Sequence, residues 1–211
     1  QREHGMEYLF GCDSYDKGKV NPNSGSRGCT IGYKPTKVIQ GAEQLYSELS
    51  NCKNDIYREL KIHLELGDLP VFMYLDEGRD HEMFYQQSAL AAQYFNEAKI
   101  MIENNRNGMI EWFKANGYTH LMKRTPQKQK TIYQGRIANS YGYYRGEEEK
   151  EADVIRVNAF VNNKCASLFF RPLIKGLMTY QPDVNKKKND ETDAFSACLF
   201  HLTVRSEEHT S

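Results

Sequence analysis

The stretch "YLFGCDSYDKG", Tyr8 to Gly18, decides how this chain folds. Its first residues are apolar and aromatic and turn residues follow, which is the pattern of a short buried strand over 8–13. That strand ends on a carboxylate, Asp13, which is costly at a buried strand end unless it is paired or metal-bound. The stretch therefore predicts a buried strand with a candidate ligand at its end. Gly11 gives the small profile that a close approach at that edge requires.

The remaining apolar runs predict further strands and helices in a definite order. Asp80 has the N-cap position of one predicted helix and Gly117 the C′ position of another. Hairpin-linked strands followed by strand–helix alternation imply an α/β domain, in which a mixed five-stranded sheet carries helices on both faces. Strands are expected over 8–13, 29–34, 71–78, 98–105 and 118–123, and helices over 42–64, 80–95, 108–117, 147–180 and 190–202.

Composition excludes several classes of protein. Lys plus Arg and Asp plus Glu both number 28, so net charge argues neither for nucleic acid nor for a membrane surface. The 5 cysteines lack zinc-site spacing, and the 6 histidines include no HExxH pattern. No apolar run reaches the roughly 18 residues of a membrane span. We therefore expect a soluble intracellular chain with reduced cysteines and no membrane partner.

Acids stand at three places in otherwise buried elements: Asp13, Glu103, and the pair Asp190 and Asp193. If the strands over 8–13 and 98–105 are parallel neighbours, the first two acids share the carboxyl edge of the sheet, where ligands bind. The pair is spaced i, i+3 and can share one helix face. Such a set of hard oxygen ligands suits Mg²⁺ or Mn²⁺, and two ions about 4 Å apart would support phosphodiester hydrolysis.

Each acid also has an ordinary structural interpretation. Asp13 could cap the turn in "DSYD", and Glu103 could mark the point where a strand meets solvent. Asp190 with Asp193 could be an N-cap and its N3 partner. The metal interpretation therefore depends on the three places together. Four other acids are interpreted as turn or surface residues: Asp16, Asp76, Glu77 and Asp80.

With these residues in view, the chain resembles the C-terminal nuclease domain of tailed-phage large terminase subunits, which has an RNase H-like fold. The resemblance covers 6–204 as one domain, in which 35–69 looks like a helical insertion. The tail 205–211, "RSEEHTS", is expected to be non-native or disordered. The pieces that carry the resemblance are "YLFGCDSYD", "LDEGRDHEMFYQQ", "AKIMIENNRNGMIEWFKANGYTHLMKR", the segment from "NSYGYY" to "LIKGLMTY", and "NDETDAFSACL".

The resemblance implies a metal-dependent endonuclease that cuts concatemeric double-stranded DNA during packaging. The family's catalytic metal triad carries over onto Asp13, Glu103 and Asp193, with Asp190 as an auxiliary ligand to Mg²⁺ or Mn²⁺. The implied partners are the portal protein and the small terminase subunit, reached through the full-length protein. That protein would act in the host cytoplasm, transiently bound to the procapsid.

The ATPase half of the family is missing from this sequence. No G-x-x-x-x-G-K-[ST] pattern occurs, and the chain starts at Gln1 without an initiator. We therefore expect a fragment of a longer polypeptide, or the product of a split gene.

An acid-free window over 123–146 predicts a DNA-contacting surface despite the zero net charge. Local positive charge is what phosphate binding requires, although a solvated lysine-rich loop would show the same pattern. Besides Arg145, the window interleaves Tyr133, Tyr141, Tyr143 and Tyr144, which could stack on a frayed base. The candidate DNA-binding residues are Lys123, Arg124, Lys128, Lys130 and Arg136, with Lys186 and Lys187 of "NKKKN".

Two other functions fit the same residues. A RuvC-type resolvase is also RNase H-like and would prefer four-way DNA junctions. A metal-free docking or DNA-holding module of the packaging motor would use these acids only as caps and surface groups.

Overall fold

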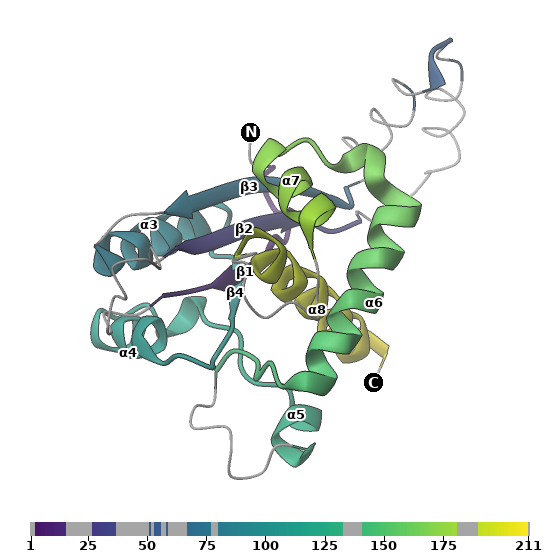
Figure 1. Ribbon diagram of the computed structural model, residues 1–211. Coiled ribbons are helices and arrows are strands. Elements are labelled where there is room, and N and C mark those ends of the chain that lie inside the picture. The colour runs from purple at the N-terminus through teal and green to yellow at the C-terminus, as the bar shows by residue number, and fades with distance from the viewer. Residues whose placement is uncertain are drawn as a thin grey trace.

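The fold is built around a mixed sheet of four strands in the order β3-β2-β1-β4 (Figure 1). β1 pairs antiparallel with β2 and parallel with β4, and β2 pairs antiparallel with β3. The predicted α/β class, hairpin and mixed sheet are thereby confirmed. The strands are β1 (Leu9–Asp13), β2 (Gly28–Lys34), β3 (Leu69–Asp76) and β4 (Lys99–Ile102). The computed structural model describes residues 3–15, 27–36, 51, 53–55, 58, 67–76, 80–132, 141–180 and 190–210.

The fifth strand predicted over 118–123 is not found there. Thr119–Leu121 forms a 3₁₀ turn, η1, and the next residue, Met122, makes only a single parallel bridge with Ile100. Beyond that bridge the outer edge of β4 is taken by a different segment, because the amide of Tyr143 donates to the carbonyl of Ile102 at 2.9 Å. The prediction was wrong for this segment because two short stretches share the edge that one strand was expected to occupy.

Gly142 lets the second of these stretches reach β4. Its φ is +76°, in the left-handed region that favours glycine, and a Cβ there would overlap the carbonyl oxygen of Ile102. The following carbonyl, of Tyr143, accepts a hydrogen bond from the amide of Asn104 at 2.9 Å. The chain is thus held against the end of β4 just before it enters the next helix.

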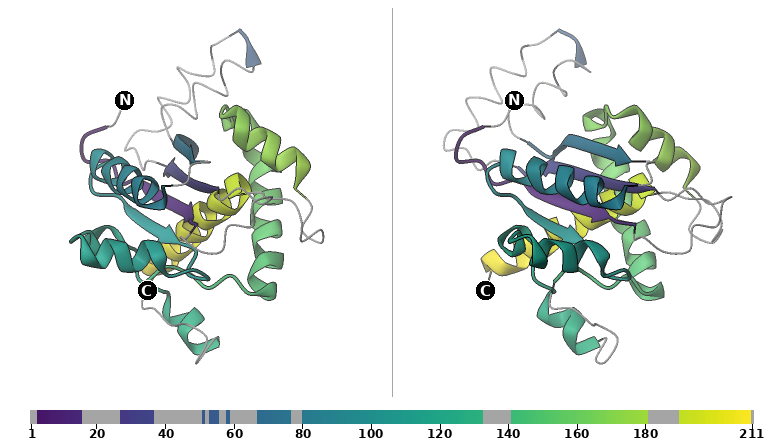
Figure 2. Two further views of the ribbon diagram at one scale, coloured as in Figure 1. Left: turned by 60° about the vertical axis from the view of Figure 1, so that its left-hand side comes forward. Right: turned by 90° about the vertical axis from the view of Figure 1, so that its left-hand side faces the viewer.

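Helices cover both faces of the sheet, as predicted (Figure 2). α3 and α4 lie on one face, and α8 lies on the other, with α6 and α7 packed on α8. Asp80 caps α3 by accepting from the amide of Met83 at 3.1 Å, and Gly117 follows α4 with φ +80°, so both predicted caps are confirmed. The helices are α3 (His81–Tyr94), α4 (Gly108–Ala115), α5 (Gln127–Ile132), α6 (Glu147–Lys164), α7 (Arg171–Thr179) and α8 (Asp190–Thr210).

The helical region predicted over 147–180 is two helices rather than one. α6 ends at Lys164, and the chain then passes through a 3₁₀ turn, η2, over Cys165–Ser167 before α7 begins. Pro172 stands in the first turn of α7. Proline is tolerated there but not in a helix interior, so its position explains the break.

Alternation along β1 decides which way Asp13 faces. Phe10 and Cys12 belong to the core cluster under α3 and α4, whereas Leu9 belongs to the cluster under α8. Successive side chains of a strand point to opposite faces, so Gly11 and Asp13 are on the α8 side. The backbone of α8 passes so close to Gly11 that a Cβ would not fit between them. The first turn of α8 and the end of β1 therefore share one face of the sheet.

Some predictions fall on residues that the structure does not describe or does not test. Most of the insertion over 35–69, and with it most of the helix predicted over 42–64, lies outside the described residues. The extent of the domain over 6–204 and the nature of the tail over 205–211 stay predictions. Within the described ranges, no helix combines the length and the apolar character that crossing a bilayer requires.

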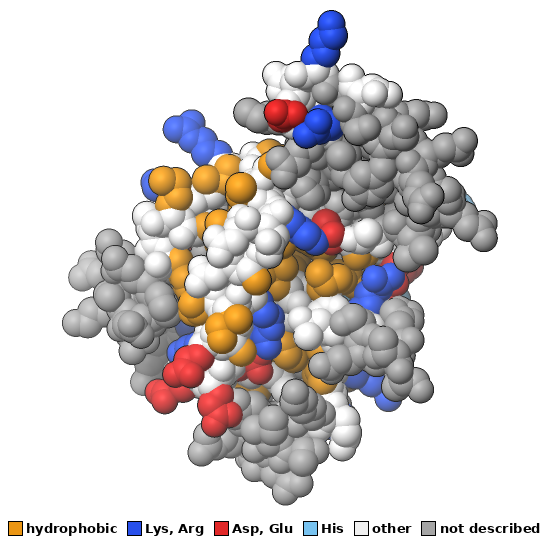
Figure 3. Space-filling model, turned by 90° about the vertical axis from the view of Figure 1, so that its right-hand side faces the viewer, with side chains coloured by type: hydrophobic (Ala, Val, Ile, Leu, Met, Phe, Trp, Pro, Cys, Tyr) orange, Lys and Arg blue, Asp and Glu red, His pale blue; other side chains and the backbone are white. Residues whose placement is uncertain are grey.

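An apolar groove of about 430 Å³ lies between α6 and α7. Figure 3 shows this side of the molecule, where hydrophobic side chains gather among dispersed Lys and Arg. Val154, Val161 and Leu177 are among the side chains that line the groove, and Tyr180 stands at its border. Tyr180 also accepts a hydrogen bond from Arg145 at 3.3 Å, which connects the groove to the buried charges described below.

His201 of α8 makes the stability of the fold sensitive to acid. Its ring is 1% exposed, and Nδ1–H donates to the carbonyl of Phe10 at 3.2 Å. Burial lowers the pKa of His201 to about 3. The unfolded chain therefore binds a proton at this histidine that the folded chain does not. The contribution of His201 to stability is full above pH 6.5 and falls as the pH drops toward 3, by about 1.4 kcal/mol per pH unit.

We expect His201→Gln to flatten this dependence, because the amide can still donate to Phe10 but does not titrate. Urea unfolding of both proteins at pH 7 and pH 5 measures the difference. His120→Gln is the comparison variant, because it removes a histidine that is exposed rather than buried. Equal slopes in wild type and His201→Gln would contradict the prediction.

Candidate functional site

Asp13 and Glu103 are brought together by the pairing of β1 with β4. The two strands run parallel with Cys12 opposite Ile102, and the amide of Glu103 donates to the carbonyl of Cys12 at 2.9 Å. Each acid is the next residue after this pair, so both stand at the carboxyl edge of the sheet. The conditional expectation that these strands are parallel neighbours is confirmed.

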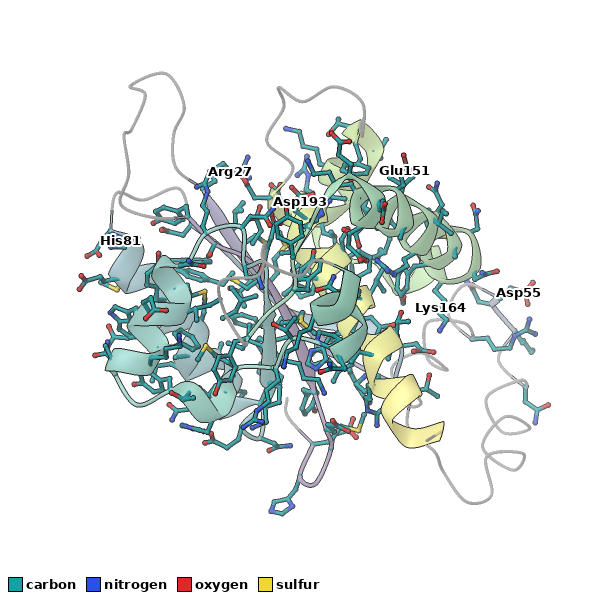
Figure 4. The ribbon with its side chains drawn as sticks, turned by 90° about the horizontal axis from the view of Figure 1, so that it is seen from below. Arg27, Asp55, His81, Glu151, Lys164 and Asp193 are labelled. Atoms are coloured by element: carbon teal, nitrogen blue, oxygen red, sulfur yellow. The ribbon has the colours of Figure 1, made fainter. Side chains whose placement is uncertain are left out.

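α8 brings Asp190 and Asp193 to the same edge, since both lie in its first turn. Figure 4 shows Asp193 on the same side of the molecule as Arg27, at the end of the sheet where β2 begins. Arg27 forms ion pairs with Asp190, at 3.5 Å, and with Glu191. The start of the helix is thereby tied to the start of β2. Acids in a first turn also suit the helix dipole, so the capping interpretation remains compatible with this geometry.

The acids are close enough to disturb each other's ionisation. Burial raises the pKa of Asp13 well above its usual range, and the charges of Glu103, Asp193 and Asp190 raise it further. Burial also raises the pKa of Glu103 to about 7, although Arg145 opposes this. Such mutual repulsion is the signature of carboxylates that share a site and lack full compensation.

Arg145 supplies most of the compensation that the site has. Only 5% of its side chain is exposed. Its Nη1 lies 2.7 Å from Oδ1 of Asp193 and 3.6 Å from Oε2 of Glu103, while Nε donates to Asp153 at 2.7 Å. The sequence had placed this arginine in a DNA-contacting window. The structure corrects that interpretation, because the guanidinium is buried among the acids.

Asn105 fixes the backbone of Arg145 beside the site. Its side-chain oxygen accepts from the amide of Arg145 at 3.2 Å, and its Nδ2 donates to the carbonyl of the same residue at 3.1 Å. Nδ2 also donates to Oε1 of Glu103 at 2.8 Å. One amide side chain therefore couples the position of the arginine to that of the carboxylate.

Asp153 is a participant that sequence reasoning missed. Its side chain is fully buried on α6, where it accepts from Arg145 and, at 2.6 Å, from Arg156. Burial raises its pKa to about 6, while Arg145 opposes the rise. A signal was present in the sequence, because Asp153 lies on the same helical stripe as Val157 and Phe160, both of which are buried.

The side chains at this edge have the chemical type of metal ligands, but they are not arranged around an ion. Asp13, Glu103 and Asp193 offer only carboxylate oxygens, which are the ligands that Mg²⁺ and Mn²⁺ prefer. In the part of the chain that the structure describes, no group of three or more acid, histidine or cysteine side chains is arranged to hold a metal ion. A guanidinium already pairs with two of the three carboxylates. The donor set fits the metal, and its present cation is Arg145.

The other interpretations of the acids have mixed outcomes. The backbone of Asp13 pairs with Cys29 in the sheet, but its carboxylate forms no hydrogen bond among the described residues, so nothing described there supports a turn-capping role. Asp80 is exposed and caps α3, which fits its interpretation as a turn or surface residue. Asp76 is the last residue of β3 and accepts from the hydroxyl of Tyr15. Two further candidates of that kind lie outside the described residues: Asp16 and Glu77.

The candidate DNA-binding residues are only partly described. Arg124 is exposed, and Lys123 and Lys130 are partly buried. Tyr143 is fully buried and stacks on Phe200 with ring centroids 4.8 Å apart, so it is not available to stack on a base. The side chains that the structure does not describe are those of Lys128, Arg136, Lys186 and Lys187.

Comparisons with protein families and with curated proteins identified no relative of this chain. No protein-family model and no curated protein matches the chain.

Proposed function

We propose that this chain is the nuclease part of a tailed-phage large terminase subunit, a Mg²⁺- or Mn²⁺-dependent endonuclease that cuts concatemeric double-stranded DNA. The observation that carries the proposal is the convergence of acids from three elements at one sheet edge. Asp13 ends β1, Glu103 follows β4, and Asp193 lies in the first turn of α8. Structural capping alone gives no reason to gather these half-buried carboxylates where their charges repel one another.

The residues would divide the work as follows. Asp13 and Glu103 present carboxylates from the rigid sheet, Asp193 presents a third from α8, and Asp190 is an auxiliary ligand. Two bound ions would supply an activated water and neutralise the leaving oxygen of the phosphodiester. Arg27 holds the start of α8 against β2 through Asp190 and its neighbour, which fixes where the helical ligands stand.

The RNase H-like fold belongs to the same proposal. The hairpin of β1 and β2, the parallel pairing of β4 with β1, and helices on both faces support it. The wider role follows from the resemblance: the full-length protein would join an ATPase domain, the portal protein and the small terminase subunit at the procapsid in the host cytoplasm.

Plasmid cleavage tests the proposal. Supercoiled DNA is incubated with the protein in Mn²⁺, in Mg²⁺ and in EDTA, and nicked and linear products are counted. Products that depend on the metal are expected from the plasmid. When a four-way junction and a linear duplex are offered as substrates, the protein should show no preference for the junction. A strong junction preference would favour a resolvase instead.

A docking or DNA-holding module is the second candidate, and one observation favours it. Arg145 already pairs with Glu103 and Asp193, as it would in a site that never binds metal. Calorimetric titration with Mn²⁺ separates the two candidates, because only the nuclease requires that the acids bind the ion. Absence of both binding and cleavage would favour the docking module.

The basic window gives a prediction about DNA affinity. Replacing Lys128, Lys130 and Arg136 together by Gln is expected to weaken binding of duplex DNA and to flatten its salt dependence. Each lost phosphate contact should reduce the slope of log K against log salt by about 0.9. Filter binding or anisotropy between 50 and 200 mM salt (roughly the range over which such contacts are sensitive) measures it.

A second triple variant serves as a control, because it loses the same three positive charges as the variant of the basic window. It replaces Lys114, Arg171 and Lys175, which lie on α4 and α7, by Gln. That control should retain the wild-type salt slope. If the slope of log K against log salt is unchanged when Lys128, Lys130 and Arg136 are replaced, the prediction is contradicted.

A further inference from the structure

We propose that Arg145 takes the place of the divalent cation and competes with it. In this state its guanidinium holds Glu103 and Asp193 together. When the cation binds, the guanidinium gives up both carboxylates and stays tethered to Asp153. The inference rests on the proposed function, since it concerns the same acids.

The contacts of Arg145 are those of a stand-in cation. Within the described ranges, it is the only Lys or Arg whose side chain forms ion pairs with both Glu103 and Asp193. One atom, Nη1, makes both contacts, so a single positive group bridges an acid that follows the sheet and an acid of α8. Glu103 and Asp193 are also two of the residues that would hold a divalent cation.

The guanidinium is anchored so that it can release these acids without leaving the site. Nε donates to Asp153 at 2.7 Å and Nη2 donates to the hydroxyl of Tyr180 at 3.3 Å. Asp153 is itself held by Arg156 at 2.6 Å. The two contacts of Nη1 can therefore be exchanged for a metal ion while the rest of the group keeps its partners. Buried Asp153 would then not be left as an uncompensated charge.

One arginine leaves the acid cluster incompletely neutralised. Its single charge is shared among Glu103, Asp193 and Asp153, and Asp13 has no ion pair among the described residues. A divalent cation carries twice the charge and accepts six or more oxygen ligands, so it can contact Asp13 as well. At sufficient concentration the cation should displace the guanidinium from both carboxylates. Its apparent affinity is its intrinsic affinity multiplied by the fraction of molecules in which Arg145 does not pair with them.

Arg145→Gln tests the competition through metal affinity, without relying on cleavage. Calorimetric titration with MnCl₂ is expected to give at least about tenfold tighter binding than in wild type, because the competing state is removed. Arg156→Gln is the matched control. This substitution removes one positive charge from the same network. The arginine that it removes contacts Asp153 and Glu149 rather than the proposed metal ligands. This control accounts for the general effect of a lost charge.

The outcomes separate failure of the inference from failure of the proposed function. Tighter Mn²⁺ binding in Arg145→Gln than in Arg156→Gln supports competition. Equal or weaker binding overturns it and assigns Arg145 a purely structural role, while the metal site survives. Absence of Mn²⁺ binding in wild type and in both variants overturns the metal site itself, and the inference with it.

Arg145→Lys covers the case in which the glutamine variant does not fold, as judged by circular dichroism in EDTA. Lysine keeps the charge, but its single ammonium cannot reproduce the fork that reaches Asp153 and Asp193 together. Binding of Mn²⁺ tighter than in wild type is again expected. Affinity equal to or below that of wild type would overturn the proposal.

Discussion

Asp13→Asn is expected to lower the rate of Mn²⁺-dependent plasmid cleavage about 100-fold or more. Loss of a direct metal ligand removes several kcal/mol of transition-state stabilisation, and about 3 kcal/mol corresponds to that factor. The amide keeps the size of the carboxylate but loses its charge. Initial rates of nicking at saturating DNA measure the effect.

The same substitution should leave the fold intact. Because the pKa of Asp13 is raised, the ionised carboxylate destabilises the folded state at neutral pH, and a neutral amide removes this penalty. In EDTA the thermal midpoint of Asp13→Asn is expected to equal or exceed that of wild type. A lower midpoint would mean that Asp13 serves the fold rather than the reaction.

Asp76→Asn is a close control for this variant. β1 and β3 both pair antiparallel with β2, so Asp76 ends its strand at the same edge of the sheet as Asp13. It is bound by Tyr15 and lies outside the acid cluster. Cleavage by Asp76→Asn should stay near wild type. Full activity in Asp13→Asn, or equal loss in both variants, would contradict the assigned role.

Gly11→Val is expected to destabilise the protein by about 3 kcal/mol or more, or to prevent folding. A Cβ at this position would lie 2.5 Å from the carbonyl oxygen of Ala194 and nearer still to the amide nitrogen of Cys198. Both atoms belong to the backbone of α8, which cannot move aside as a side chain does. Overpacking against a fixed neighbour has costs of this order. Chemical denaturation followed by circular dichroism measures the change.

Gly176→Ala shows what an added methyl group costs where it can be accommodated. Gly176 is in α7 and also packs against α8, but its nearest neighbour is the side-chain oxygen of Thr192 at 3.2 Å. Alanine favours a helix over glycine by up to about 1 kcal/mol, which offsets a modest contact. This variant should stay within about 1 kcal/mol of wild type. A similar small effect in Gly11→Val would show that α8 does not press on β1.

The pairing of Asp13 with Glu103 was predictable because the signal is local. Each acid ends or follows a short apolar run, and two such runs in a parallel sheet must finish at one edge. The amphipathic runs and capping residues likewise predicted most helices, including α3 with its cap at Asp80. These features depend on residues within a few positions of one another, which a sequence displays directly.

Arg145 could not be placed in the same way. In the sequence it is one cation in an acid-free window, and its partners Glu103 and Asp193 are far away along the chain. Only the path of the backbone, held by Asn105 and Gly142 at the end of β4, turns it inward. The missing fifth strand has a related cause, because which segment occupies a sheet edge is settled by long-range pairing rather than by local propensity.

The shared outer edge of β4 also limits self-association. An exposed strand edge is a template on which another chain can add, and proteins that fail to protect such edges tend to aggregate. Here the amide of Lys123 donates to Ile100 and that of Tyr143 donates to Ile102, so the edge is already engaged along most of its length. The segments around Lys123 and Tyr143, which lie where a fifth strand was expected, thus block further strands from adding at this edge. On the β4 side of the sheet, little strand edge is therefore left on which a second copy of the chain could add.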